Sequence, residues 1–177
     1  MLMLKSILLT LMFFAFANLT CAQKLTPNSI INTKTGSFVT KQDPSYSDDM
    51  VVVNSKNIYH KINPKTGPAN ISSVERRDKS GLLNSFTQVF SDERLTQLLP
   101  EKYMLMTLYV NPAGKVLEVT FFLKKTTVIE AKELEELENA IKANVSFKLL
   151  PNETKGGDFF PIGQIVKYSR VLDRTLK

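Results

Sequence analysis

Two alternating segments joined by a turn constrain the fold of this chain more than any other feature. Apolar residues recur at every second position from Met104 to Val110 and again from Leu117 to Leu123. Such alternation places successive side chains on opposite faces of a strand. The linking segment, Asn111-Pro112-Ala113-Gly114, supplies a proline that fixes an early turn angle and a glycine that adopts a positive φ without steric cost. The sequence therefore predicts a β-hairpin over 104–123.

An amphipathic helix is predicted soon after the hairpin. Leu134, Leu137 and Ile141 recur at spacings of three and four, which forms one apolar stripe along a helix. Thr127 and Glu130 have the spacing of a capping box, which marks the start of such a helix. The other side is interpreted as a solvated face rather than as paired catalytic carboxylates. Its members are Glu133, Glu135, Glu136, Glu138 and Lys142.

Two further segments complete the pattern of the second half. Apolar residues at helical spacing run over 82–99, with Ser91 in a position to cap a new turn and Pro100 at the end. After a Gly-containing loop, the segment 159–172 is predicted to be the final strand. One face of that strand is expected to carry Phe160, Ile162, Val166 and Tyr168.

The order helix, hairpin, helix and strand over 92–172 resembles the C-terminal domain of TonB-like periplasmic proteins. The residues that carry the resemblance are Val-Asn-Pro-Ala-Gly-Lys-Val in the hairpin and Ala-Ile-Lys-Ala-Asn-Val-Ser-Phe at the end of the helix. The resemblance implies a two-layer α+β fold, with an antiparallel sheet of three or more strands packed by two helices.

The chain departs from TonB proper in three respects. It has a predicted cleavable signal where TonB keeps a membrane anchor, it shows no Pro-rich spacer, and Phe147 stands where a tryptophan is frequent in the family. The resemblance therefore implies a stand-alone domain over 82–177, without an energy-transducing role.

Residues 23–81 are predicted to form an irregular N-terminal extension. The first part is poor in large apolar side chains, and 40–49 is typical of a loop or a mobile arm. Short apolar runs at 50–53 and 58–62 flank a turn-forming segment, so they are interpreted as two short strands of a possible hairpin.

Residues 1–22 have the three parts of a secretory signal peptide. Lys5 gives a basic start, an apolar run follows over 7–19, and Thr20-Cys21-Ala22 is a small-residue exit. The run is shorter than the ~20 apolar residues that a membrane span needs. We expect cleavage after Ala22 and a periplasmic or secreted protein with no membrane span; the alternatives are an uncleaved anchor and an acylated Cys21.

Composition limits the partners and the chemistry. Cys21 is the only cysteine, so a cleaved chain forms no disulfide and depends on an apolar core for stability. The formal net charge is +6, but the basic residues are scattered. The densest cluster, Arg76-Arg77 with Lys79, has no interleaved aromatic residues, so no nucleic-acid partner is expected.

No catalytic, cofactor or metal site is predicted. His60 is the only histidine, it has no acidic residues at ligand spacing, and no Gly-x-Ser-x-Gly element accompanies it. The acidic residues Asp43, Asp48 and Asp49 fit no ligand-loop pattern and are interpreted as a solvated loop. Core packing is the preferred interpretation of Met104 and Met106, over a pliable binding surface.

The edge of the final strand is the one feature that indicates a function. An edge strand presents unpaired backbone groups, so we expect the segment 164–170 to accept an extended peptide from a partner or from a second copy of the chain. The predicted partner-binding residues are Gln164, Val166, Tyr168 and Arg170. The competing interpretation is that Pro161, Lys167 and Arg170 protect this edge.

Two other classes of function stay open. A hydrolase acting on envelope or extracellular polymers would need a cleft with convergent acids, which no recognisable spacing in the sequence provides. A structural subunit would use 23–81 to dock on a larger assembly.

Overall fold

Six antiparallel strands form one sheet, in the order β1-β2-β3-β6-β5-β8. The structure is a computed structural model that describes residues 23–62, 75–76, 80–149 and 157–176, so the predicted signal peptide lies outside it. The strands of the sheet are β1 (Ile30–Asn32), β2 (Ser37–Gln42), β3 (Asp49–Asn54), β5 (Tyr103–Val110), β6 (Val116–Lys124) and β8 (Phe160–Lys167). A second, two-stranded ladder joins β4 (Glu75–Arg76) to β7 (Phe147–Lys148).

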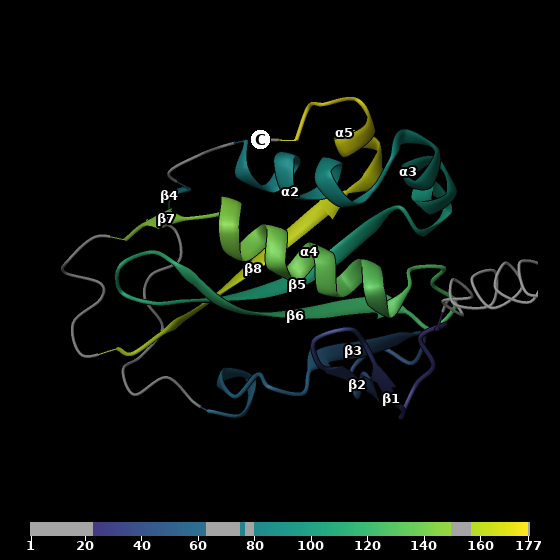
Figure 1. Cartoon of the computed structure of the whole chain (residues 1–177), viewed down its shortest axis with the longest axis horizontal. Helices are drawn as coiled ribbons and strands as arrows, with labels where there is room; N and C mark the ends of the chain where they lie inside the picture. Colours follow the sequence, from purple (N-terminus) through teal and green to yellow (C-terminus); the bar gives the residue numbers. More distant parts are fainter. Residues whose placement is uncertain (1–22, 63–74, 77–79, 150–156, 177) are drawn as a thin grey trace, which may run out of the picture.

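Helices cover one face of the sheet and its upper end (Figure 1). They are α2 (Gly81–Val89), α3 (Asp92–Leu98), α4 (Ala131–Asn144) and α5 (Tyr168–Leu172), with 3-10 turns η1 (Tyr59–Lys61) and η3 (Leu99–Glu101). The fold is thus α+β with two layers, as predicted, although the sheet has six strands.

The predicted hairpin is β5 and β6, and its turn depends on Gly114. This residue has a φ of 84°, and its N–H donates to the Asn111 carbonyl over 2.8 Å. A Cβ at Gly114 would lie 1.9 Å from the Phe147 carbonyl oxygen, and the Phe147 N–H donates to the Gly114 carbonyl over 2.8 Å. No other residue fits this turn, which also ties β7 to the hairpin.

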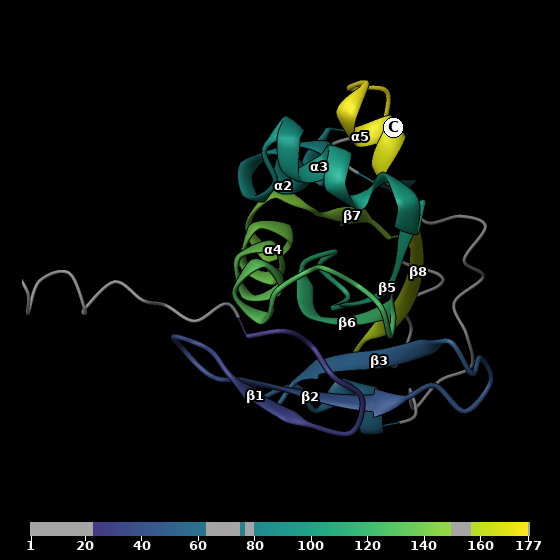
Figure 2. The ribbon, with the colours of Figure 1, turned by 90° about the vertical axis from the view of Figure 1, so that its right-hand side faces the viewer.

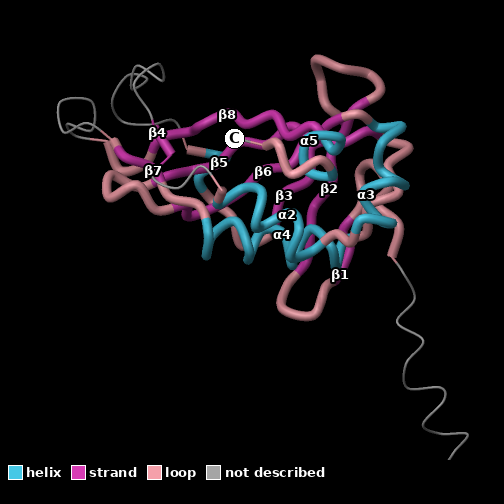
Figure 3. Tube along the Cα trace, turned by 90° about the horizontal axis from the view of Figure 1, so that it is seen from above, coloured by secondary structure: helices cyan, strands magenta, loops and turns pink. Residues whose placement is uncertain are grey.

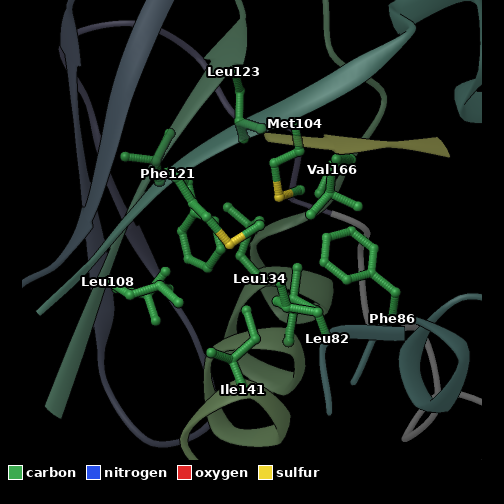
Figure 4. Packing of buried hydrophobic residues seen from close by; sticks show 14 of the residues in the cluster. Leu82, Phe86, Met104, Leu108, Phe121, Leu123, Leu134, Ile141 and Val166 are labelled. Atoms are coloured by element: carbon green, nitrogen blue, oxygen red, sulfur yellow. The ribbon is translucent and has the colours of Figure 1, made fainter. Parts of the chain in front are cut away.

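Helix α4 packs across β5, β6 and β8, as the sequence predicts (Figure 2). Leu134, Leu137 and Ile141 are fully buried, and burial of each contributes about 1.5–3 kcal/mol. Figure 4 shows two of them, Leu134 and Ile141, among core residues of the strands. The strand residues labelled there are Met104, Leu108, Phe121, Leu123 and Val166. Met104 and Met106 are both buried core residues.

The capping box of α4 is displaced by one turn from the predicted one. The Glu130 side chain accepts from the N–H of Glu133, and the Glu133 carboxylate accepts from the Glu130 N–H over 2.8 Å. Thr127 instead donates its hydroxyl proton to the Glu101 carboxylate, at 3.0 and 2.8 Å from the two oxygens. The prediction for α3 is confirmed, because the Ser91 hydroxyl accepts from the Arg94 N–H over 3.2 Å.

The final strand is shorter than predicted. The last backbone bond of its ladder joins the Tyr168 N–H to the Lys102 carbonyl over 3.1 Å, and the chain then turns into α5. Tyr168 and Val171 lie on one side of this short helix and are fully buried. Their burial favours a helix at 168–172 over a continuation of the strand.

The prediction of an irregular N-terminal extension was wrong for much of 23–54. This segment supplies β1, β2 and β3, and β3 pairs with β6 in the middle of the sheet. Phe38, Met50 and Val52 are fully buried there. The two predicted short strands do not pair with each other, because 50–53 lies in β3 and Tyr59–Lys61 forms a 3-10 turn.

Two glutamates of α4 fasten these N-terminal strands to the helix. Glu135 accepts from the Thr33 hydroxyl at 2.6 Å, and from the Thr35 hydroxyl and N–H at 2.6 and 3.0 Å. Glu138, which is 2% exposed, accepts from the amide of Asn54 at 3.1 Å. The prediction of a solvated acidic face was therefore wrong for Glu135 and Glu138, because the N-terminal strands pack against it.

Candidate functional site: the free edge of β8

Strand β8 lies along one margin of the molecule (Figure 3). It pairs with β5 over its whole length and with no other strand among the described residues. Antiparallel ladder bonds engage alternate residues of a strand. Since the Tyr168 N–H bonds to Lys102 and the ladder has no bulge, the even-numbered residues of β8 direct their backbone groups toward β5.

The odd-numbered residues therefore direct their backbone groups away from the sheet. We call the outward N–H and C=O groups of Gly163, Ile165 and Lys167 the β8 edge. Pro161 belongs to the same set but has no N–H, so it marks one limit of the edge without costing β5 a ladder bond. The start of α5 at Tyr168 marks the other limit.

One carbonyl of the β8 edge already has a neighbour. The side-chain amide of Gln164 donates to the Gly163 carbonyl over 2.8 Å. A carbonyl oxygen accepts two hydrogen bonds, so this oxygen keeps one acceptor position, and the exposed amide can also move away.

The predicted partner-binding residues do not all belong to this edge. Gln164 and Val166 lie in β8, but their backbone groups face β5, and the Val166 side chain is fully buried. Tyr168 and Arg170 lie in α5, where Tyr168 is buried and Arg170 is exposed. The predicted edge, 164–170, was therefore wrong beyond Lys167. It included Ile165 but not Gly163, and neither was among the predicted partner-binding residues.

A signal for the missed residues was present in the sequence. Proline has no N–H, so within a sheet it is confined to positions of an edge strand whose backbone groups face outward. The residues two and four positions after Pro161 face the same way. Those residues are Gly163 and Ile165.

The sheet face that points away from α4, here called the open face, carries an apolar row that ends at this edge. The pairing registers place Val51 opposite Phe122, Phe122 opposite Leu105, and Leu105 opposite Ile165. Ile165 is 64% exposed. Aliphatic and aromatic side chains in such a row offer contact area to whatever lies beside β8.

A groove of about 550 Å³ lies over this row. Its side-chain walls are Tyr46, Leu105, Thr107, Phe122 and Ile165, and Gly163 borders it. Tyr46 is 65% exposed and stands on the loop between β2 and β3. We call this hollow the Tyr46 groove.

Aspartates shape the loop that carries Tyr46. The Asp43 carboxylate accepts from the N–H groups of Ser45 at 2.7 Å and Tyr46 at 3.3 Å. Asp49 pairs with Lys124 over 2.7 Å. The prediction of a solvated acidic loop was wrong for Asp43, which is 7% exposed. Its carboxylate accepts hydrogen bonds from backbone N–H groups of the same turn.

The opposite end of the open face is covered. The ring of Phe159 lies 4.7 Å from that of Tyr59 and 5.9 Å from that of Tyr109, measured between centroids. Glu118 holds η1 over this end by accepting from the N–H groups of Ile58 at 2.7 Å and Tyr59 at 2.9 Å. Burial raises the pKa of Tyr109. Among the described residues, the end with the Tyr46 groove is not covered in this way.

His60 lies in η1, not in a strand as predicted. It borders a hollow of about 210 Å³ together with Lys41 and Lys61. Burial, and then the charge of Lys61, lower the pKa of His60, so the ring is neutral near pH 7. Among the described residues, no group of three or more His, Cys, Asp or Glu side chains is placed to hold a metal ion.

Another hollow, of about 840 Å³, lies between α4 and the turn that joins β1 to β2. Three glutamates line it, Glu130, Glu135 and Glu136, and the Glu135 carboxylate accepts hydrogen bonds from the hydroxyls of Thr33 and Thr35. Burial alone would raise the pKa of Glu135, but these hydrogen bonds outweigh it and leave the pKa below its ordinary value. This carboxylate is therefore ionised and occupied in a structural contact.

Within the described part of the chain, no helix combines the length and the apolar character needed to cross a bilayer.

Comparison with known proteins gives a fold neighbour and no family. No family model matches the sequence, and no curated protein matches it, so the resemblance to TonB-like domains stays a prediction. Among solved structures, the chain is similar to a DUF5043 family protein from Bacteroides uniformis, with a TM-score of 0.63 over 80% of this chain and 86% of that one. The two sequences are 15% identical, so the likeness concerns the α+β fold alone.

Proposed function

We propose that this protein is a non-enzymatic, exported interaction module that binds an extended peptide by adding it as a strand to the β8 edge. The observation that supports this most is the row of outward backbone groups at Gly163, Ile165 and Lys167 beside an apolar groove. In strand addition, backbone hydrogen bonds supply affinity and pockets for alternate side chains supply specificity. The β8 edge and the Tyr46 groove offer both.

The protective features of β8 leave its middle accessible. Natural edges are blunted by short strands, lysines, prolines or bulges. Here Pro161 and Lys167 stand at the two ends, and the residues between them include Gly163 and the 64% exposed Ile165. The opposite edge, β1, has three residues and offers much less ladder.

A peptide suits this edge better than a second copy of the chain. The window between Pro161 and α5 is short, so two β8 edges pairing with each other would share few backbone bonds. A flexible peptide, in contrast, can also bend over the open face and reach the Tyr46 groove. Self-association is a separate outcome of the test below.

The test selects binders to the mature chain from a displayed library of random peptides of about six residues, the usual length of a strand. Amide hydrogen exchange is then followed by NMR with and without a synthetic binder. We expect the amides of Gly163, Ile165 and Lys167 to exchange fast in the free protein and slowly in the complex. Those of Gln164 and Val166 are slow in both states, which provides an internal control.

Three results would contradict the proposal. One is the failure of the library to yield a binder, and another is a binder that leaves the three outward amides unprotected. The third is protection of these amides in a dimer without peptide, seen by analytical ultracentrifugation, which would assign the edge to self-association. The variant Ile165→Pro removes one outward N–H and is expected to weaken binding, whereas Ile165→Ala keeps that N–H.

A further inference from the structure

Gly163 has no side chain, so the row of β8 side chains on the open face has a gap at this position, next to the β8 edge. The register places Gly163 opposite Thr107, and a Cβ built at Gly163 would meet nothing within 4 Å. A glycine inside a strand often marks a place where a ligand or another chain comes close. A strand added to β8 would put one of its own side chains beside this gap.

The gap leads directly into the Tyr46 groove. Gly163 borders that groove, and Ile165 and Leu105 form its wall on the side of β8 and β5. Along β8, residues 163 and 165 face the same way. A side chain that starts beside Gly163 on the open face can therefore lie across the glycine and enter the groove over Thr107 and Leu105.

The walls of the groove favour an aromatic occupant. Tyr46 and Phe122 present rings from two different segments, and Leu105 and Ile165 add aliphatic surface. Aromatic rings bury about 150–250 Å² each and gain further from edge-to-face contacts. A ring lying across a strand glycine also covers backbone that the glycine leaves bare.

The groove offers no free charge to a polar occupant among the described residues. The Asp43 carboxylate is used by the N–H groups of its own loop, and Asp49 is paired with Lys124. Burying a charged side chain without a partner is costly. A charged residue at this position of the peptide would thus bind less well than an aromatic one.

We propose that the peptide recognised at the β8 edge carries one aromatic side chain opposite Gly163, and that the Tyr46 groove is the specificity pocket for it. This inference rests on the proposed function, because it assumes a strand added to β8. It goes further by naming the class of side chain that the site selects, and by assigning Gly163 and Tyr46 as the residues that select it.

The absence of tryptophan from the chain gives a direct readout. A binder from the peptide selection is synthesised in versions with Trp or Ala at each position in turn. We expect a single position where Trp binds about ten-fold more tightly than Ala, the size of effect that a buried aromatic anchor produces. Its fluorescence should shift to shorter wavelength on binding, because the indole leaves water.

Two variants test the pocket from the protein side. Gly163→Phe fills the groove with a ring of the protein's own, and Tyr46→Ala removes a wall whose side chain is 65% exposed. Each is expected to reduce the preference for Trp to about two-fold or less and to abolish the spectral shift. Thermal unfolding checks that both variants are folded, and Ile30→Ala, at a 71% exposed position on the β1 edge, is the matched control with unchanged preference.

The outcomes separate this inference from the function on which it rests. If Trp and Ala versions bind the wild-type protein equally well at every position while the outward amides become protected, strand addition stands and the aromatic pocket is wrong. If the amides stay unprotected, the proposed function falls and takes the pocket with it. A Trp preference that survives both Gly163→Phe and Tyr46→Ala would place the aromatic site elsewhere.

Discussion

The sheet differs at its two sides, the N-terminal side with β1 to β3 and the C-terminal side with β8. On the N-terminal side, Glu135 and Glu138 of α4 accept hydrogen bonds from the turn after β1 and from the end of β3. On the C-terminal side, β8 pairs only with β5 among the described strands and exposes Ile165. One side, the closed side, is fastened to α4 by buried carboxylates. On the other, the free side, the outward backbone groups of β8 pair with no strand among the described residues.

This contrast shows that exposure cannot be judged from residue type. Glutamates on a helix usually face water, yet here two of them hold three strands in place. An isoleucine usually lies in the core, yet Ile165 lies on the surface. The closed side is expected to govern stability and the free side to govern binding, and the following variants test that division.

The largest effect is expected from Glu138→Ala. Glu138 accepts from Asn54 at 3.1 Å and from Lys142 at 2.7 Å, and lies 3.4 Å from the amide of Asn57. Its removal takes an acceptor from the half-buried amide of Asn54 and leaves the buried amide of Asn57 with the Val119 carbonyl alone. The free energy of unfolding should therefore fall by about 2–3 kcal/mol. Urea denaturation measures this loss.

The control lies on the same helix. Glu136 is exposed and faces Lys132 at 3.8 Å, so Glu136→Ala should change the free energy of unfolding by less than about 0.5 kcal/mol. Equal effects of the two substitutions would show that Glu138 does not fasten the N-terminal strands.

A smaller and pH-dependent effect is expected from Glu135→Gln. The pKa of Glu135 lies below its ordinary value of 4.5, so its ionised form stabilises the fold above pH 4.5, and this contribution is lost as the pH falls through the lowered pKa. At pH 7 the variant should lose about 1–2 kcal/mol of unfolding free energy. The gap between variant and wild type should narrow in acid, as followed by denaturation from pH 7 to pH 3; a constant gap would contradict the assignment.

Tyr168→Phe tests the junction between β8 and α5. The Tyr168 hydroxyl is buried and has no hydrogen-bond partner among the described residues, and burial raises its pKa. Removing an unpaired buried hydroxyl should leave the free energy of unfolding unchanged or raise it by up to about 1 kcal/mol. A clear loss in urea denaturation would reveal a bonding partner for this hydroxyl.

The smallest effect on stability is expected from Ile165→Lys. The side chain is 64% exposed on the β8 edge, so the free energy of unfolding should change by less than about 0.5 kcal/mol. Peptide binding, in contrast, should be strongly weakened, because a lysine replaces the apolar wall of the Tyr46 groove. A large loss of stability together with unchanged binding would contradict the expectation that the free side governs binding and not stability.

The sequence predicted the hairpin and α4 because their signals are local. Alternation around a Pro-Gly turn determines β5 and β6, and a stripe at three-four spacing determines α4. Residues 50–53 were predicted as a strand, but their pairing with β2 was not, because one inward position of β2 is polar. Thr40 is 1% exposed and accepts from the Ser29 N–H over 2.9 Å, which satisfies a buried hydroxyl but breaks the apolar alternation.

The roles of Glu135 and Glu138 could not be predicted from their neighbours along the helix. Their partners Thr33 and Asn54 lie 102 and 84 positions away in the chain, so burial of these glutamates depends on tertiary packing. The free edge was predicted only in part for a related reason. Which alternate residues of β8 face outward depends on its register with β5, and the end of the strand depends on the burial of Tyr168.

The limits of the β8 edge also bear on aggregation. Fibril-forming segments are typically six or seven uninterrupted residues of high β-propensity and low charge, which stack indefinitely from copy to copy. Here the accessible window contains Gly163, ends at the charged Lys167, and is bordered by Pro161 and by a helix. The β8 edge therefore gives copies of the chain too short a template to stack indefinitely along this strand.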